Sequence, residues 1–289
     1  MKWIADPQHL DSIDALDTMY PTSLTVLKDK GRHLGGGPVN TTYGVVVRGR
    51  ADVTIGGSTY QLWAGDYFSG PGDVNVELFA DGEAVCINRH GFRGQVCVGR
   101  LEDRGRLSYI DGCSDSMLVY PPRLGDPVLN HLHFPGDILQ TQHTHPSIRM
   151  GVVMAGEGVS WRGKFGQKED LRPFMDFAAE HGLEKVVAWY DAYKRQANLT
   201  EREQLSYRLD AGQDVLELDI KQAREVFGNI DMLYHLKAGG VFQLEEGELH
   251  SFATVPGGHM EIVAYHPDSD WGPTDQDHPM LNRTYIPIR

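Results

Sequence analysis

The chain has 289 residues, a formal net charge of −13, 40% hydrophobic residues and 33 glycines. This length is sufficient for one large or two medium domains with a sizeable core. The negative charge argues against general electrostatic binding of nucleic acids or anionic membranes.

The cysteine pattern and the N-terminal segment bear on the compartment. Cys86, Cys97 and Cys113 have no C-x-x-C spacing, which favours free thiols in a reducing cytosol over a disulfide framework. The first residues lack the apolar core of a signal peptide, and no stretch has the apolar length of a membrane helix. We therefore expect a soluble, cytoplasmic protein.

Residues 41–110 predict a series of short strands. A run of β-branched residues is followed by a Gly56–Gly57 turn between two alternating segments, and further Gly and Pro breaks come after it. Residues 118–160 repeat this style. The pattern is typical of an antiparallel sandwich or barrel.

From Asp170 to about Gly228 the periodicity becomes helical. Pro173 suits a first helical turn, Thr200 with Glu203 fits a capping box, and residues 219–227 predict another short helix. The strand pattern then returns. Polar residues of the tail suggest a loop ordered by side-chain turns, namely Trp271, Asp275, Asp277, His278 and Asn282.

Two pairs of segments indicate an internal repeat. Residues 44–50 resemble residues 151–157, and residues 65–71 resemble residues 239–245. The offsets are 107 and 174 residues, and their difference of 67 is about the size of the helical segment. The second half is therefore expected to repeat the first, with a helical insertion between its two strand groups.

Three histidines form a candidate metal site. His143 and His145 would project from the same face of a strand, and His250 could complete a three-nitrogen face. Imidazole binds several transition metals well, so the ligand set does not name the metal. Three protein ligands leave coordination positions open, as a catalytic site requires. The alternative is a polar strand end with exposed histidines.

The spacing around these histidines resembles the two motifs of the cupin superfamily, usually written G-x5-H-x-H-x3or4-E-x6-G and G-x5-P-x-G-x2-H-x3-N. This chain has one extra residue before its H-x-H, Arg149 in place of Glu, Glu245 in place of Pro and Thr254 in place of Asn. The residues that match the motifs are Gly136, His143, His145, Gly156, Gly239, Gly247 and His250.

The resemblance implies a mainly β fold of two cupin (jelly-roll) barrels. We expect an N-terminal barrel over residues 1–115 without metal ligands and a C-terminal metal-binding barrel over residues 116–289. The helical insertion at about 170–228 belongs to the C-terminal barrel, where it could act as a lid. The N-terminal barrel would support the active half or form a homodimer interface.

The repeat offsets place three residues of the N-terminal half opposite the candidate ligands. Gly36 and Pro38 correspond to His143 and His145, and Val76 corresponds to His250. None of the three can bind a metal through its side chain. We therefore expect one divalent transition metal per chain, with Fe(II) favoured and Zn, Mn, Ni or Cu as alternatives.

The glutamate of the cupin motif is missing here, and this suggests a reaction class. The arrangement of three histidines without a carboxylate resembles that of some cupin dioxygenases. The leading hypothesis is a non-haem Fe(II) dioxygenase that acts on a small chelating organic acid, with an anionic substrate and O2 as its partners. Arg149 would anchor the substrate anion, or form a salt bridge with a residue such as Glu157. Glu245, or its neighbours Glu246 and Glu248, would act as a general base or an extra ligand, or lie solvated in a turn.

Two other functions remain open. One is a metal-dependent isomerase or lyase on a sugar or organic acid, in which the metal acts as a Lewis acid. The other is a small-molecule sensor, although no basic helix-turn-helix is evident. A second H-x-H, His131 and His133, would supply contacts around the site or simply surface polarity.

Overall fold

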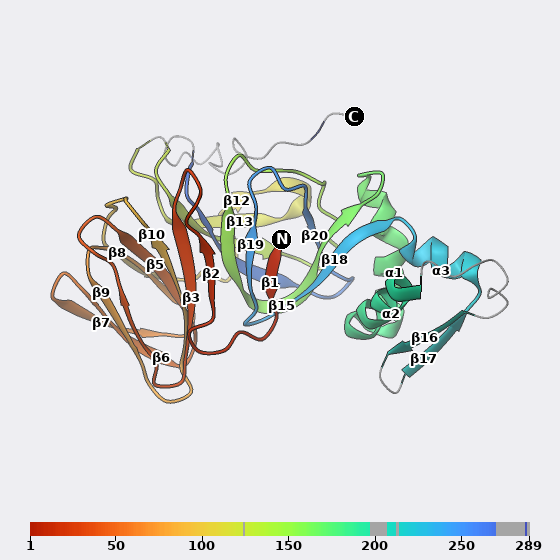
Figure 1. Ribbon diagram of the computed structural model, residues 1–289, viewed down its shortest axis with the longest axis horizontal. Helices are drawn as coiled ribbons and strands as arrows, with labels where there is room; N and C mark the ends of the chain where they lie inside the picture. Colours follow the sequence, from red (N-terminus) through yellow and green to blue (C-terminus); the bar gives the residue numbers. More distant parts are fainter. Residues whose placement is uncertain (124, 197–206, 212–213, 270–286, 288–289) are drawn as a thin grey trace.

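The computed structural model describes the chain except for residues 124, 197–206, 212–213, 270–286 and 288–289. Two β barrels lie side by side, and the insertion lies on the side of the C-terminal barrel that faces away from the N-terminal one (Figure 1). The Thr200–Glu203 capping box and the tail cluster from Trp271 to Asn282 fall outside the described residues. None of the described helices has the length and apolar character needed to span a membrane.

The N-terminal barrel is built from two antiparallel sheets. Val46, Val53, Phe68 and Val76 are among the buried residues of its interior, as alternation of apolar side chains along the strands predicts. The larger sheet has the order β11 (Cys97–Arg100), β8 (Asp66–Pro71), β5 (Thr41–Arg48), β10 (Glu83–Arg89), β3 (Thr22–Lys28) and β2 (Ser12–Ala15). The smaller sheet has the order β4 (Arg32–Gly35), β9 (Val74–Leu78), β6 (Arg50–Ile55) and β7 (Ser58–Trp63).

The C-terminal barrel is organised around one long strand. The strand order is β1 (Lys2–Ile4), β19 (Val241–Leu244), β15 (Arg149–Gly163), β21 (Met260–His266), β14 (Val128–Phe134), β13 (Ser114–Val119) and β12 (Leu107–Ser108). The second half of β15 leaves this sheet and pairs with β18 (Ile230–Lys237) and β20 (Ser251–Ala253). The β15 strand therefore connects both walls of the barrel.

Strand order shows the repeat directly. The N-terminal order β2-β3-β10-β5-β8-β11 matches the C-terminal order β13-β14-β21-β15-β19-β1. The segments that resemble each other in sequence lie on β5 and β15, and on β8 and β19, at equal positions in the two sheets. The mainly β, two-barrel fold class is thus confirmed.

Strand pairing divides the chain differently from the boundary expected at residue 115. The short strands β1 and β12 come from the first 115 residues, but both belong to the C-terminal sheet. The two large sheets face each other across a shared core, in which the Tyr43 and Tyr265 rings lie 4.9 Å apart. This sheet-on-sheet contact buries apolar side chains from both barrels.

The insertion contains helices, as expected, and one unexpected hairpin. The helices are α1 (Arg172–His181), α2 (Leu183–Gln196) and α3 (Ile220–Phe227). Asp219 caps α3 by accepting a hydrogen bond from the Gln222 N–H. The prediction of an essentially helical segment was wrong at β16 (Tyr207–Ala211) and β17 (Asp214–Leu218), which pair as a hairpin. Residues 207–218 alternate with the period of a strand, and that short signal is easily lost between two helices.

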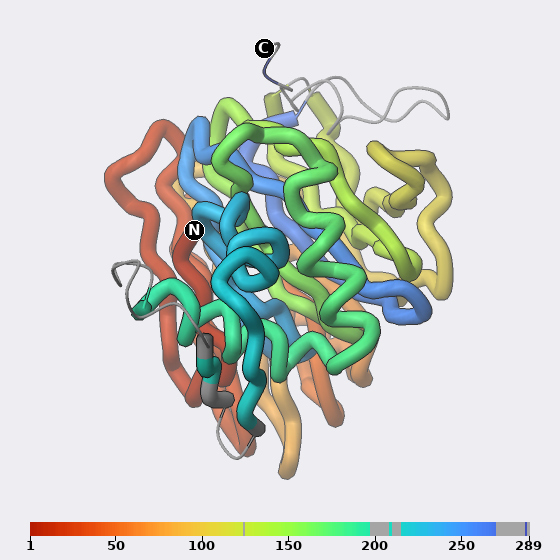
Figure 2. Tube along the Cα trace, turned by 90° about the vertical axis from the view of Figure 1, so that its right-hand side faces the viewer, coloured from red at the N-terminus to blue at the C-terminus, as the bar shows by residue number. Residues whose placement is uncertain are grey.

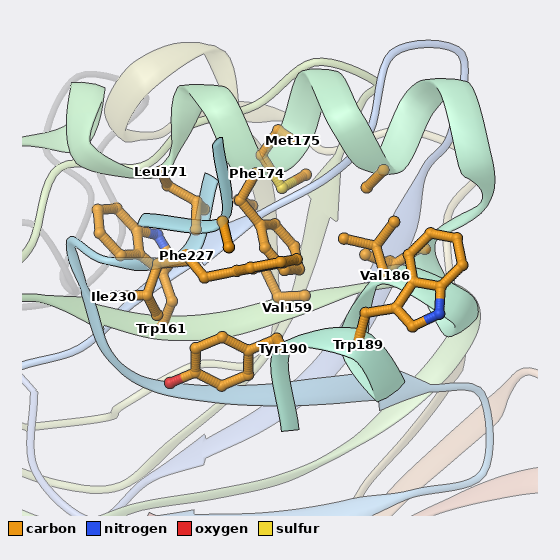
Figure 3. Packing of buried hydrophobic residues seen from close by; sticks show 14 of the residues in the cluster. Val159, Trp161, Leu171, Phe174, Met175, Val186, Trp189, Tyr190, Phe227 and Ile230 are labelled. Atoms are coloured by element: carbon orange, nitrogen blue, oxygen red, sulfur yellow. The ribbon is translucent and has the colours of Figure 1, made fainter. Parts of the chain in front are cut away.

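The insertion packs on the outer side of the C-terminal barrel. Phe174 of α1 and Phe227 of α3 are fully buried against Val159 and Trp161 of β15 (Figure 3), and burial of each ring contributes about 1.5–3 kcal/mol. Figure 2 shows the helices in front of the strands when the molecule is viewed from this side. The short helix η2 (Lys168–Leu171) leads into α1, and η1 (Ile110–Gly112) precedes β13.

Candidate metal centre

The three candidate ligands are carried by two extended segments that meet at one pair of residues. His143 and His250 form an isolated antiparallel bridge, with backbone N–H···O distances of 3.0 Å in both directions. Gly247 has φ +69°, a conformation that favours glycine, and its N–H donates to the His145 carbonyl at 2.9 Å. The turn before His250 is therefore tied to the segment that holds the other two histidines.

The imidazoles converge in the interior of the C-terminal barrel. One ligand atom from each of His143, His145 and His250 lies within 4.8 Å of the others. The ring centroids of His143 and His250 are 4.5 Å apart, and the His145 ring lies 5.1 Å from each. All three side chains are buried. Such a cluster of nitrogen donors is suited to a divalent transition metal.

Backbone contacts set the tautomers of two of these rings. Nδ1 of His143 lies 2.8 Å from the Thr141 carbonyl, and Nδ1 of His250 lies 2.9 Å from the Glu248 carbonyl. Because a carbonyl oxygen only accepts, each Nδ1 must carry the proton and donate it. Nε2 of each ring then keeps its lone pair, the arrangement found in metal-binding histidines.

Burial also keeps the rings neutral. It lowers the pKa of His143 to about 4, although the hydrogen bond to Thr141 acts in the opposite direction. Burial lowers the pKa values of His145 and His250 well below 6.5, and the positive charge of Arg149 adds to the effect. All three imidazoles are therefore deprotonated near pH 7, as metal ligation requires.

The histidines line a small internal cavity of about 20 Å³, roughly the space of one or two water molecules. Its remaining wall is largely apolar, and among the described residues no carboxylate lines it. The apolar lining residues are Leu132, Phe134, Phe242, Leu244, Phe252 and Ala264, and the polar ones are Tyr109, Gln140, Arg149 and His266. No described residue of the insertion lines the cavity, so the expected lid has no support.

Arg149 combines parts of its two expected roles. Its side chain is 2% exposed and lines the cavity beside the histidines. It also donates to the Ser147 carbonyl at 3.1 Å and pairs with Asp268 at 3.3 Å. The prediction of Glu157 as the salt-bridge partner was wrong, because the Glu157 carboxylate lies 2.8 Å from Nε2 of His235.

Glu245 does not line the cavity. It follows Leu244, whose side chain lines the cavity, so the next residue points the other way. The Glu245 side chain is 49% exposed and lies 3.6 Å from Nζ of Lys2. The nearby Glu248 carboxylate binds the Met1 amino group and the Glu245 N–H. The geometry thus gives no support to Glu245 as a general base or as a ligand.

Two residues near the centre were missed by sequence reasoning. His266 ends β21 and places its ring 6.0 Å from that of His145. Met260, Ile262 and Ala264 of the same strand face the interior, so His266 faces inward as well. Val263 and Tyr265 on the other face are also buried, so the sequence alone did not show which face is inside. Asp268, the buried partner of Arg149, had no comparable signal.

The N-terminal barrel has a different polar set at the corresponding place. On its β4–β9 pair, the residue opposite Val76 is His33, and Gly36 and Pro38 lie beyond the end of β4. The constant repeat offset was therefore wrong for this segment, because the loop between β4 and β5 differs in length. Among the described residues, the groups of three or more converging ligand side chains both lie in the C-terminal barrel.

Comparison with protein families gives no matching family model, and comparison with curated proteins gives no match. Among solved structures, a glyoxylate-induced protein from Pseudomonas aeruginosa is similar over 92% of this chain and 81% of its own, with 14% identity and a TM-score of 0.50. The chain has a cupin fold. The similarity to the Pseudomonas aeruginosa structure supports the fold alone and does not indicate an activity.

Two further cupin-like structures were found at lower similarity. A cupin 2 conserved barrel domain protein from Leptotrichia buccalis covers 92% of this chain and 96% of its own, with 12% identity and a TM-score of 0.49. An oxalate decarboxylase from Bacillus subtilis, which has Mn(II) centres, covers 90% of this chain and 73% of its own, with 10% identity and a TM-score of 0.45.

Proposed function

We propose that the C-terminal barrel holds one Fe(II) ion through His143, His145 and His250, and that the protein is a dioxygenase of a small chelating organic acid. The observation that carries the proposal is the donor set: three buried, neutral imidazoles converge, and no described carboxylate lines their cavity. Fe(II), when bound, supplies the electrons that activate O2 and the charge that attracts a chelating anion.

Arg149 supports an anionic substrate. Its guanidinium lines the same cavity as the histidines, and a guanidinium can bind a carboxylate with two parallel hydrogen bonds. Asp268 already balances part of this charge. A substrate carboxylate would therefore share or replace the contact with Asp268, and Arg149 would orient the acid toward the three imidazoles.

The rest of the cavity supports a small substrate and a water-poor reaction. Phe134, Phe242, Leu244 and Phe252 form an apolar wall that would exclude water from a reactive intermediate. The cavity of about 20 Å³ holds only one or two water molecules, so binding of even a small acid would require the lining side chains to move apart. The backbone contacts of His143 and His250 hold two of the rings in place, which would preserve the donor arrangement between turnovers.

A metal-dependent isomerase or lyase is the second candidate, and one observation favours it. Tyr109 and His266 line the cavity and could carry a proton between substrate atoms. In this reaction class the metal would act as a Lewis acid and O2 would not be consumed. Glu245 is not the proton carrier in this version, because it points away from the cavity.

Oxygen consumption separates the two candidates. The protein is reconstituted anaerobically with Fe(II) and screened in an oxygen electrode against small 2-oxo and 2-hydroxy acids. We expect O2 uptake with at least one acid, and its loss in His143→Ala and His250→Ala variants. The exposed His259 provides a matched control, since His259→Ala should retain activity. Turnover that proceeds unchanged without O2 would replace the dioxygenase with the isomerase or lyase.

A further inference from the structure

A second group of ligand side chains lies on the outer face of the C-terminal barrel. His131 and His133 on β14 and Glu261 on β21 offer ligand atoms that all lie within 4.8 Å of one another. Glu261 is directly opposite His133 in the antiparallel pair, and His131 is two residues along the same face. Leu132, between the two histidines, lines the inner cavity, so this group projects away from the inner imidazoles.

The buried nitrogens of this outer group need a partner. His131 is 0% exposed and His133 is 8% exposed. Nε2 of His133 has no hydrogen-bond partner among the described residues, and Nε2 of His131 has only its 3.2 Å contact with Glu261. A buried polar atom without a partner destabilises the folded state, and a native structure usually compensates it. A metal ion would do so, because an unprotonated ring nitrogen donates its lone pair.

We propose that His131, His133 and Glu261 form a second metal site, of the zinc type, on the outer face of the barrel. Two imidazoles and one carboxylate suit Zn²⁺, which takes a water molecule as the fourth ligand when the protein supplies three. Ligand atoms of a tetrahedral Zn²⁺ site lie roughly 3.4 Å apart. Nε2 of His131 and Oε2 of Glu261 are already 3.2 Å apart, and the His133 ligand atom lies within 4.8 Å of both.

The ion has a route to this site. His133 and Glu261 also line an open groove on the outer face, together with Asp103, Arg104 and His259. Metal and water can therefore reach the group without opening the barrel. A structural ion pair between His131 and Glu261 is the competing explanation, but it leaves Nε2 of His133 without a partner.

The position of the site indicates what it would stabilise. Leu129 and Val263, on the same face of β14 and β21, belong to the core shared with the N-terminal barrel. An ion bound next to this core would link β14 and β21 where the barrels meet. Binding to the folded state alone then raises the unfolding temperature in proportion to the logarithm of the metal concentration.

Zinc stoichiometry tests the site independently of the inner one. The full chain with His143→Ala and His250→Ala is stripped with a chelator and dialysed against Zn²⁺, and bound zinc is measured by elemental analysis. We expect one Zn²⁺ per chain, which falls to zero when His133→Ala or Glu261→Gln is added. A His9→Ala control in the same background, which removes an exposed histidine outside both groups and outside this groove, should retain its zinc. The Glu261→Gln variant preserves side-chain size, so circular dichroism should show an intact fold.

The inner and outer sites give separate outcomes. The wild-type chain should bind two Zn²⁺, and the outer-site variants should bind one. In the His143→Ala/His250→Ala chain, bound Co²⁺ should give a visible absorption spectrum that disappears when Glu261→Gln is added. No zinc in the inner-site double variant would overturn the outer site and leave the inner proposal intact. Zinc that persists in that background after Glu261→Gln and His133→Ala would overturn it equally.

Discussion

The two barrels share one strand order but carry different chemistry at the same positions. By register, Thr42 and Asn88 of β5 and β10 correspond to Arg149 and His266 of β15 and β21. In the N-terminal barrel, Thr42 donates to Asn88 Oδ1 at 2.8 Å, and Asn88 Nδ2 lies 3.3 Å from Nε2 of His33. Its polar groups therefore satisfy one another.

The C-terminal barrel does the opposite. His143 and His250 use Nδ1 for backbone contacts, and Nε2 of His250 is buried without a hydrogen-bond partner among the described residues. A buried nitrogen lone pair that is kept free for a ligand is costly to the folded protein. The comparison teaches that the scaffold alone does not make a metal site: the number of imidazoles and the direction of their lone pairs do.

The largest expected effect is on metal affinity. Replacing His143 or His250 with Ala removes one of three donors, and we expect affinity for Fe(II) to fall at least about 100-fold, since even outer contacts of metal ligands contribute 10–100-fold. Metal content and circular dichroism of each variant check the result. Full metal occupancy in both variants, with the fold intact, would break the contrast between the barrels.

Acid should destabilise the metal-free protein through the inner histidines. The pKa of His143 is about 4 in the folded state and about 6.5 in the unfolded chain, so the unfolded chain binds the proton first. Stability is therefore full above pH 6.5 and falls between pH 6.5 and 4, by up to roughly 3 kcal/mol from this residue. Urea unfolding of chelator-treated protein at several pH values measures it. If the free energy of unfolding of His143→Gln falls with decreasing pH as steeply as that of the wild type, His143 is not the cause of the loss.

Arg149 should affect substrate more than metal. Removing Arg149 alone would leave the buried Asp268 carboxylate without its cation and destabilise the fold by roughly 3–5 kcal/mol. The double variant Arg149→Leu/Asp268→Asn avoids that cost, and we expect its KM to rise about 10–100-fold, equivalent to about 1.4–2.8 kcal/mol. Metal content should remain near that of wild type, with Asp268→Asn as the control. Unchanged KM would remove Arg149 from substrate binding.

The smallest effect is expected in the N-terminal barrel. His33→Ala removes a half-buried imidazole and its contact with Asn88, which should cost about 1 kcal/mol of stability and leave metal content unchanged. Thermal unfolding and elemental analysis measure both quantities. A loss of bound metal in this variant would show that the N-terminal barrel takes part in metal binding.

Much of the fold was predictable because it depends on local periodicity. The Gly56–Gly57 turn, the alternating strands and the two repeat offsets were sufficient to predict two related β halves with an insertion, and the resemblance to cupin motifs implied that both halves are barrels. The hairpin of residues 207–218 was not, since its alternation is short and lies between two helices. The position of the insertion also depends on the apolar surface of Val159 and Trp161 on β15, and sequence did not reveal which face these residues occupy.

The candidate site was predictable only in part. The H-x-H spacing and the flanking glycines identified His143, His145 and His250, which the fold brings together. The orientation of Glu245 and the contribution of His266 depend on which face of a strand is buried, and this follows only once the register is known. The Arg149–Asp268 pair joins residues 119 positions apart, a separation at which sequence spacing carries no information.

Anomalous scattering from crystals grown with Fe(II) would test the central claim most directly. The account predicts a strong iron peak among His143, His145 and His250, and none between β4 and β9 of the N-terminal barrel. An iron peak beside His33 and Val76, or no peak among the three C-terminal histidines in iron-loaded crystals, would contradict it.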